Sequence, residues 1–186
     1  MDSLEWRAEQ VCRTAWPALE EKALGGWLLR LAPGVTRRVN SLNPTGPGAG
    51  HIDGTIRAAE PLFAATGQPV LFRIPSFLDP DIDRRVEELR YTAEGNTITL
   101  YGDIDGVAKS DPASDIDCLP TPDDAWLTVM ARLQEYEPPR AAIFRQIVST
   151  LAIPAAFMRL NMDGEPAALA YGALDAGLLC CEMVIT

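Results

Sequence analysis

Few residues in this chain have the types and spacing of a catalytic or metal site. The single histidine, His51, argues against a serine–histidine relay or a multi-histidine metal centre, and its glycine-rich surroundings favour a surface position. Four cysteines, Cys12, Cys118, Cys180 and Cys181, show no C-x-x-C spacing. Because neighbouring strand residues point to opposite faces, Cys180 and Cys181 are not expected to share a metal ion or a disulfide. We therefore expect reduced structural thiols and no metal.

Two further groups of residues could bind ions, and in both cases a simpler interpretation is favoured. The segment 103–106 (D-I-D-G) begins like a calcium loop, but its glycine comes too early and no glutamate closes the loop. Arg30, Arg37 and Arg38 could bind a carboxylate or a phosphate. A salt-bridged sheet face is the favoured interpretation of these three arginines.

Composition and charge limit the classes of partner. The chain has 186 residues, a formal net charge of −10 and a sequence pI near 4.5. An acidic surface repels phosphate backbones and anionic lipids, so we expect neither nucleic acid nor membrane as a partner. An amine-bearing substrate suits this field, although acidity is also a common route to solubility. The first residues lack a basic-then-apolar secretion signal, which predicts a cytoplasmic protein.

Apolar spacing and turn residues predict a mixed chain of helices and strands. The final run, 177–186, is nearly continuous in apolar residues and contains one charge, Glu182, which predicts a strand buried on both faces. Asp53, Asp79 and Thr121 are expected to cap helices, and Asp163-Gly164 to turn a hairpin. Helices are expected over 2–16, 53–67, 79–90, 122–133 and 140–153, and strands over 26–31, 35–43, 70–74, 97–101, 156–162, 167–174 and 178–186.

The order of these elements predicts two halves joined by a linker. We expect one half over 1–103, an Asp/Pro/Ser-rich linker over 104–122, and a second half over 123–186. In the first half, two strands around an Ala-Pro-Gly turn lead into a glycine-rich loop and a helix. In the second half, two strands around an Asp-Ala-Gly turn lead to the last residue, so the second copy of this repeat is expected to be incomplete.

Specific segments of the first half resemble a known superfamily. The sequences E-E-K-A-L-G-G-W-L-L-R (20–30), T-R-R-V-N-S-L-N-P (36–44), F-A-A-T-G-Q-P (63–69) and F-R-I (72–74) resemble bacterial proteins of the GNAT superfamily of N-acetyltransferases. In those proteins a GNAT-like half precedes the catalytic half. The resemblance implies an α/β (α+β) fold, with a mixed, mostly antiparallel sheet flanked by helices.

The resemblance also implies a cofactor site on the last strand. The equivalent strand in the superfamily supplies backbone groups to the pantetheine arm of acetyl-CoA, which here implies Met183, Val184 and Ile185. A loop of pattern Q/R-x-x-G-x-G/A then holds the pyrophosphate, and here it is expected to begin after Thr186. The segment 43–48 (N-P-T-G-P-G) has similar glycine spacing, but its two prolines remove backbone donors, so an ordinary connection is favoured.

Glu182 lies close to where some members of the superfamily place the general base that takes the proton of the amine. The alternative is an edge-strand carboxylate that faces solvent, and both interpretations remain open. The resemblance implies transfer of acetyl from acetyl-CoA to a small-molecule or peptide amine. The second functional interpretation is a non-catalytic assembly module, in which the terminal strand pairs with a second copy or another partner.

Overall fold

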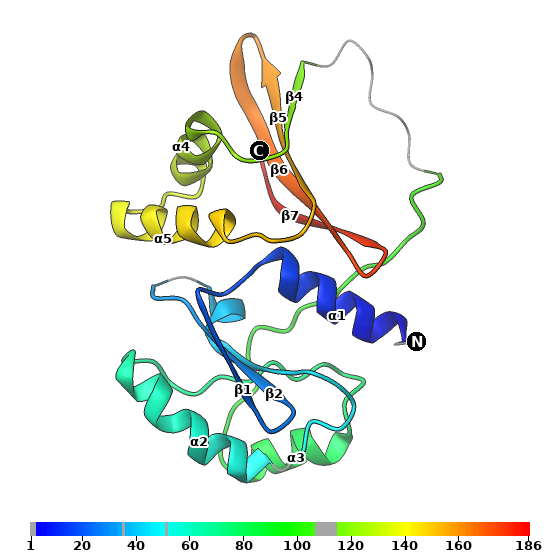
Figure 1. Ribbon diagram of the computed structural model, residues 1–186, viewed down its shortest axis with the longest axis vertical. Helices are drawn as coiled ribbons and strands as arrows, with labels where there is room; N and C mark the ends of the chain where they lie inside the picture. The colour runs from blue at the N-terminus through cyan, green and yellow to red at the C-terminus, as the bar shows by residue number, and fades with distance from the viewer. Residues whose placement is uncertain (1–2, 35, 51, 107–114) are drawn as a thin grey trace.

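The chain folds into helices and strands that form two groups (Figure 1). The computed structural model describes residues 3–34, 36–50, 52–106 and 115–186. In chain order the elements are α1 (Leu4–Ala15), β1 (Glu20–Leu24), β2 (Trp27–Leu31), the 3₁₀ helix η1 (Arg37–Val39), β3 (Ser41–Pro44), α2 (Ile52–Ala65), α3 (Pro80–Glu88), β4 (Ile116–Leu119), α4 (Asp124–Leu133), α5 (Pro138–Ser149), β5 (Ala155–Met162), β6 (Glu165–Asp175) and β7 (Leu178–Ile185).

The strands form two antiparallel sheets, which confirms the expected mixed α/β (α+β) class. The first sheet has the order β1-β2-β3 and the second the order β4-β5-β6-β7. The β5–β6 hairpin turns at Asp163-Gly164 as predicted, with φ of 54° and 83°. Two consecutive positive φ values are typical of the tight turn that matches the twist of antiparallel strands.

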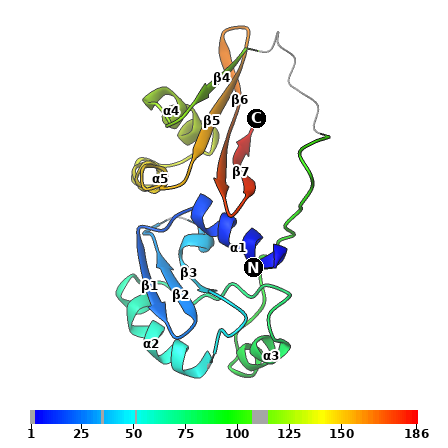
Figure 2. The same cartoon turned by 45° about the vertical axis from the view of Figure 1, so that its right-hand side comes forward.

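Helix α1 packs against the second sheet, although it lies at the opposite end of the sequence (Figure 2). Its last residue, Ala15, is buried and accepts a 2.7 Å hydrogen bond from the hydroxyl of Tyr171 on β6. At the other end of the helix, Arg7 donates to the carbonyl oxygen of Ala176 in the β6–β7 turn. By its packing, the N-terminal helix therefore belongs with the C-terminal strands.

Each sheet has its own hydrophobic core. The first core surrounds Trp27 and Phe63, between β2 and α2. The second core is centred on Trp126 of α4, whose indole N–H donates to the carbonyl oxygen of Met158 at 3.0 Å. Trp16, which follows α1, is buried in this second core. Trp27 and Trp126, which both occupy apolar positions of their elements, are fully buried.

Several predicted elements differ from the structure. Residues 97–101 alternate like a strand but form none, and Ile98 and Leu100 are 85% and 89% exposed. Residues 70–74 contribute only a parallel bridge between Phe72 and Leu42. Within the described residues 36–43, η1 precedes β3, so these residues do not form one strand. These segments have the residue types of strands, but a strand forms only where another strand lies beside it, and local sequence does not specify that partner.

Two helix starts also differ from the predictions. Helix α4 begins two residues later than expected and is capped by Asp123, whose carboxylate accepts from the backbone N–H of Trp126. Asp79 caps α3 as predicted, whereas Asp53 lies inside α2. The range expected to be a linker, 104–122, contains strand β4, which pairs with β5. Asp2, at which the first helix is expected to begin, and His51 lie outside the described residues.

The hydrogen bond between Tyr171 and α1 yields a stability prediction. Replacing Tyr171 by Phe leaves the buried carbonyl of Ala15 without its donor and should lower the free energy of unfolding by about 1–3 kcal/mol. Urea denaturation followed by far-UV circular dichroism measures the change. Tyr101→Phe is the matched control, because this tyrosine is 60% exposed and its loss should cost less than about 0.5 kcal/mol. Equal effects in the two variants would contradict the assigned contact.

Candidate active site

Strand β7 contains a β-bulge at the residues that sequence analysis singled out for cofactor binding. Tyr171 of β6 pairs with Glu182, and Leu169 pairs with Ile185, so two residues of β7 face one residue of β6. The first of the two, Met183, has φ of 54°, a value that non-glycine residues rarely adopt. A bulge interrupts the backbone ladder and re-aims the chain, and bulges are frequent beside active sites.

Strand β7 lies at the edge of its sheet and has one covered face. This corrects the prediction of a strand buried on both faces. Leu179 and Val184 are 52% and 70% exposed, whereas Glu182, the only charged residue of the strand, is 6% exposed. The reason is the strand order: β7 has β6 on one side, and α1 covers the face that carries Glu182. The interpretation of Glu182 as a solvent-facing carboxylate is therefore wrong.

Glu182 forms a two-point ion pair with Arg38, which comes from η1 in the other half of the chain. The guanidinium nitrogens Nη1 and Nη2 donate to Oε1 and Oε2 at 2.6 and 2.8 Å. The guanidinium also lies over the ring of Trp16, 5.2 Å from its centroid. Burial opposes the charge of Arg38, but hydrogen bonding to Glu182 and its negative charge outweigh burial and raise the pKa of Arg38. Paired geometry of this kind holds the carboxylate in one orientation.

The two other arginines of this group are also paired. Arg30 donates to Glu21 at 3.0 Å, and Arg37 lies 3.3 Å from Glu94. The favoured interpretation, a salt-bridged sheet face, is confirmed for Arg30, which lies on β2 and pairs with Glu21 of β1. It is wrong for Arg37, which lies in η1 and not on a sheet. For Arg38 the partner is the candidate catalytic residue, Glu182.

Three polar side chains complete the surroundings of Glu182. Tyr171 lies opposite it on β6, and burial, followed by the negative charge of Glu182, raises the pKa of the Tyr171 hydroxyl. Cys180 donates to Oε1 of Glu182 at 3.7 Å, and Cys12 of α1 lies beside Cys180. The site thus combines a bulged backbone, a paired carboxylate and two thiols on the covered face of β7.

The glycine-rich loop of the first half lies between β3 and α2. Asn43 is buried and donates to the carbonyl oxygen of Ser41, within its own strand. The backbone N–H and the hydroxyl of Thr45 both donate to the carbonyl oxygen of Gly26. Gly26, with φ of 86°, leaves room for the loop, since an added Cβ would lie 3.1 Å from Ala49.

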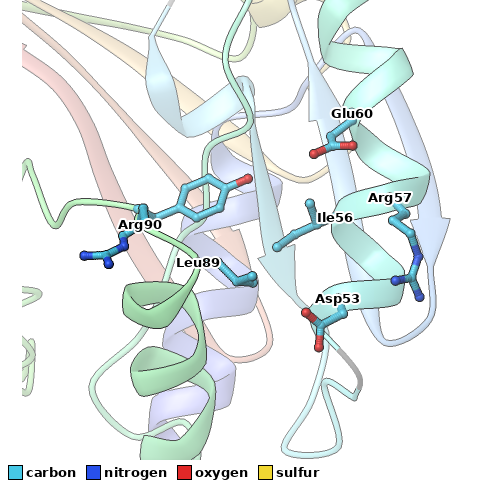
Figure 3. Close-up of a pocket in the computed structure, with 7 residues that line it drawn as sticks. Asp53, Ile56, Arg57, Glu60, Leu89 and Arg90 are labelled. Carbon is cyan, nitrogen blue, oxygen red and sulfur yellow. The ribbon is translucent and has the colours of Figure 1, made fainter.

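A pocket of about 410 Å³ lies between α2 and the end of α3, away from the predicted site residues (Figure 3). Figure 3 shows Asp53, Ile56 and Glu60 on the side of α2 that faces Leu89, while Arg90 points away. The side chain of Asp53 is engaged by Arg85, which lowers the pKa of the Asp53 carboxyl. The charged groups of this pocket are exposed or, in the case of Asp53, paired with Arg85.

Comparison with known proteins assigns the chain to a family. The family model described as "Probable histone acetyltransferase Rv0428c C-terminal" matches residues 6–173. This chain belongs to that acetyltransferase family. It is also 33% identical, over 92 residues, to "Uncharacterized N-acetyltransferase YobR" of Bacillus subtilis (strain 168). These matches confirm the resemblance to GNAT-type acetyltransferases. No solved structure matches the chain.

The match to the Bacillus subtilis relative covers 49% of this chain and 36% of that protein. The chain thus spans well under two thirds of this member of the acetyltransferase class. An incomplete second half remains a prediction, as do the boundaries of the two halves. Within the described ranges, no three His, Cys, Asp or Glu side chains come together as metal ligands would. Every described helix is too short or too polar to cross a bilayer.

Sequence reasoning identified Glu182 but missed its partner and the bulge. Arg38 lies 144 positions earlier in the chain, and no local pattern connects the two residues. The only available signal was charge: Glu182 is the one charged residue of its strand, and a charge in an apolar strand requires a partner. The bulge at Met183 has no signal in sequence, because glycine, the usual residue of such bulges, is absent there.

The pair of Arg38 and Glu182 can be tested by a double-mutant cycle. Arg38→Ala leaves a buried carboxylate unpaired and should lower the free energy of unfolding by about 2–3 kcal/mol. This loss is smaller than the loss expected for a fully buried ion pair, because the side chain of Arg38 is 39% exposed. In the background of Glu182→Leu the same change should cost at least about 1 kcal/mol less. Guanidinium denaturation measures all four proteins.

Arg37→Ala provides the matched control for this cycle. Its pair with Glu94 is exposed on both sides, so its loss should cost less than about 1 kcal/mol. Additive effects of the Arg38 and Glu182 substitutions would show that the two side chains do not depend on each other.

Proposed function

We propose that this protein takes part in transferring an acetyl group from acetyl-CoA to an amine. The observation that supports the proposal is the bulge of β7, which lies next to a buried, ion-paired carboxylate in a chain of an acetyltransferase family. A strained residue such as Met183 persists only where the surrounding structure requires it, and such positions cluster at functional sites.

The backbone at the bulge is assigned to the acetyl donor. Met183 and Val184 have no residue paired with them across β6, so their backbone groups are candidates to bind the extended pantetheine arm together with Ile185. An N–H at this position would polarise the thioester carbonyl and stabilise the negative charge that develops on its oxygen. Acetyl-CoA supplies an activated acyl group whose carbon–sulfur bond breaks as the nitrogen–carbon bond forms.

We assign Glu182 the role of the general base that takes the proton of the amine. An amine attacks only in its neutral form, so a base must take its proton, and Glu182, the residue directly before the bulge, carries a carboxylate for this role. Arg38 orients Glu182 through two hydrogen bonds. We assign Arg38 a positioning role, because its contacts are with Glu182 and Trp16.

The net charge of the protein favours an amine as the acceptor of the acetyl group. A formal charge of −10 attracts cationic amines and repels anions. The family description names histones as the substrate, and the lysine side chains of histones are peptide amines. Both small-molecule and peptide amines therefore belong in the test.

The proposal predicts binding of acetyl-CoA at the bulge. Saturating acetyl-CoA should raise the melting temperature of the protein, because a ligand that binds the folded state stabilises it. Deletion of Met183 restores regular pairing to β7 and should abolish this rise while leaving the protein folded. Met162→Ala, at the exposed hairpin end of β5, is the control and should keep the rise.

Transfer is then measured with labelled acetyl-CoA and a panel of small-molecule and lysine-peptide amines. Glu182→Gln should reduce transfer by about 100-fold or more and retain the acetyl-CoA-induced shift, because loss of a general base affects the chemical step. An unchanged melting temperature with acetyl-CoA in the parent protein would refute the proposed donor. Full activity of Glu182→Gln would refute the proposed base.

A second proposal concerns assembly and rests on the exposed side of β7. This strand has a free edge among the described strands, and it exposes Leu179 and Val184. Leu174 of β6 pairs with Leu179 and is also exposed, so the apolar side chains are neighbours. A free edge beside an apolar face is a template for another chain, and we propose a second copy as the partner.

The assembly proposal predicts a homodimer that dissociates when this surface becomes charged. Light scattering after gel filtration should show a dimer at micromolar concentration, and Leu179→Lys combined with Val184→Lys should give a monomer. Met162→Lys introduces one exposed lysine at the hairpin end and should leave the dimer intact. A parent protein that remains monomeric throughout this range would contradict the proposed dimer.

A further inference from the structure

Two cysteines from opposite ends of the sequence meet beside the candidate site. Cys12 lies near the end of α1 and Cys180 lies in β7, and their Sγ atoms are 4.0 Å apart. Both side chains are partly buried, whereas Cys118 and Cys181 are exposed. The two thiols are thus close to each other and separate from the remaining thiols, on the covered face of β7.

The contact between α1 and the β6–β7 hairpin is held by several hydrogen bonds. Thr14 and Gln10 both donate to the carboxylate of Asp175, at 2.8 and 3.1 Å. Arg7 donates twice to the carbonyl oxygen of Ala176, at 2.8 and 2.6 Å. These bonds lie on both sides of Cys12 along the helix, so the approach of the two sulfur atoms is set by the packing of α1.

We propose that Cys12 and Cys180 are a reversible dithiol–disulfide pair, which small-molecule disulfides oxidise to a covalent link between α1 and β7. A disulfide requires the sulfur atoms to approach to about 2.05 Å, with Cβ atoms about 3.5–4.5 Å apart. From 4.0 Å, the remaining approach is about 2 Å, which side-chain rotation on two partly buried residues can supply.

The reaction proceeds in two exchanges. The thiolate of Cys12 attacks one sulfur of the external disulfide, which forms a mixed disulfide and releases the first small thiolate. Cys180 then loses its proton and attacks Sγ of Cys12, which forms the internal disulfide and releases the second thiolate. The pair loses two electrons and two protons, and the external disulfide is reduced to two thiols.

Electrostatics favours Cys12 as the attacking residue. Hydrogen bonding between the two thiols lowers the pKa of Cys12 to about 7, against the opposing effects of burial, Glu9 and Glu182, and Arg73 lowers it further. The pKa of Cys180 is raised by the same contact with Cys12, by partial burial and by the negative charge of Glu182. Thiolate character therefore resides on Cys12, and Cys180 resolves the mixed disulfide.

Oxidation has a defined consequence for the site. The reduced thiol of Cys180 donates to Oε1 of Glu182, the oxygen that also accepts from Nη1 of Arg38. The disulfide has no S–H to donate, so Glu182 retains its guanidinium partner and loses its thiol partner. Residues 12 and 180 would also be joined across 168 positions of sequence, which restricts the unfolded chain.

The test uses the full chain with Cys118→Ser and Cys181→Ser, so that only the proposed pair remains. Incubation with oxidised glutathione should remove two hydrogen atoms from the intact mass and produce a Cys12–Cys180 linked peptide in an acidic digest. The oxidised protein should melt at a higher temperature, and dithiothreitol should reverse both changes.

Cys12→Ser and Cys180→Ser in the same background serve as matched controls. Cys180→Ser should stop at the mixed disulfide on Cys12, and Cys12→Ser should react much more slowly, since it removes the lower-pKa thiol. The proposal is overturned if the parent protein retains both thiols, accumulates only mixed disulfides, or forms links only between chains. Mass and melting temperature do not depend on acetyl transfer, so this result is independent of the proposed function.

Discussion

The ion pair between Arg38 and Glu182 connects every part of the candidate site. A carboxylate removed from water is costly unless it is paired, and this one is matched by a guanidinium with two hydrogen bonds. Arg38 reaches it from η1, beside the ring of Trp16. The N-terminal segments must therefore sit against the C-terminal sheet before β7 can keep its only charge buried.

This dependence explains why α1 and the C-terminal hairpin are joined by so many polar contacts. Tyr171 donates to the end of α1, and Arg7 donates to the turn after β6. Each bond holds the helix over the face of β7 that carries Glu182 and Cys180. The bulge at Met183 lies immediately after the ion pair, so the strained backbone and the paired carboxylate are held by the same packing.

The acetyltransferase family match and the geometry of β7 concern different parts of the chain. The family match covers residues 6–173 and indicates the class of chemistry. The bulge and the buried Glu182 lie beyond that range, and we propose them as the place where that chemistry would occur. The nearby thiols add a redox-sensitive contact at the same place, built from residues that the proposed acetyl transfer does not use.

Local patterns in the sequence determined the mixed fold class, the Asp163-Gly164 hairpin, the burial of Trp126 and the choice of Glu182 as a candidate site residue. They could do so because turn preference, periodicity and an isolated charge are each read from a few neighbouring residues. Tertiary structure decided that 97–101 forms no strand, that β7 is an edge strand, and that Glu182 faces α1. It alone paired Glu182 with Arg38 and brought Cys12 to Cys180, since those contacts span 144 and 168 positions. Such contacts depend on how whole elements pack, and no short window of residues contains that information.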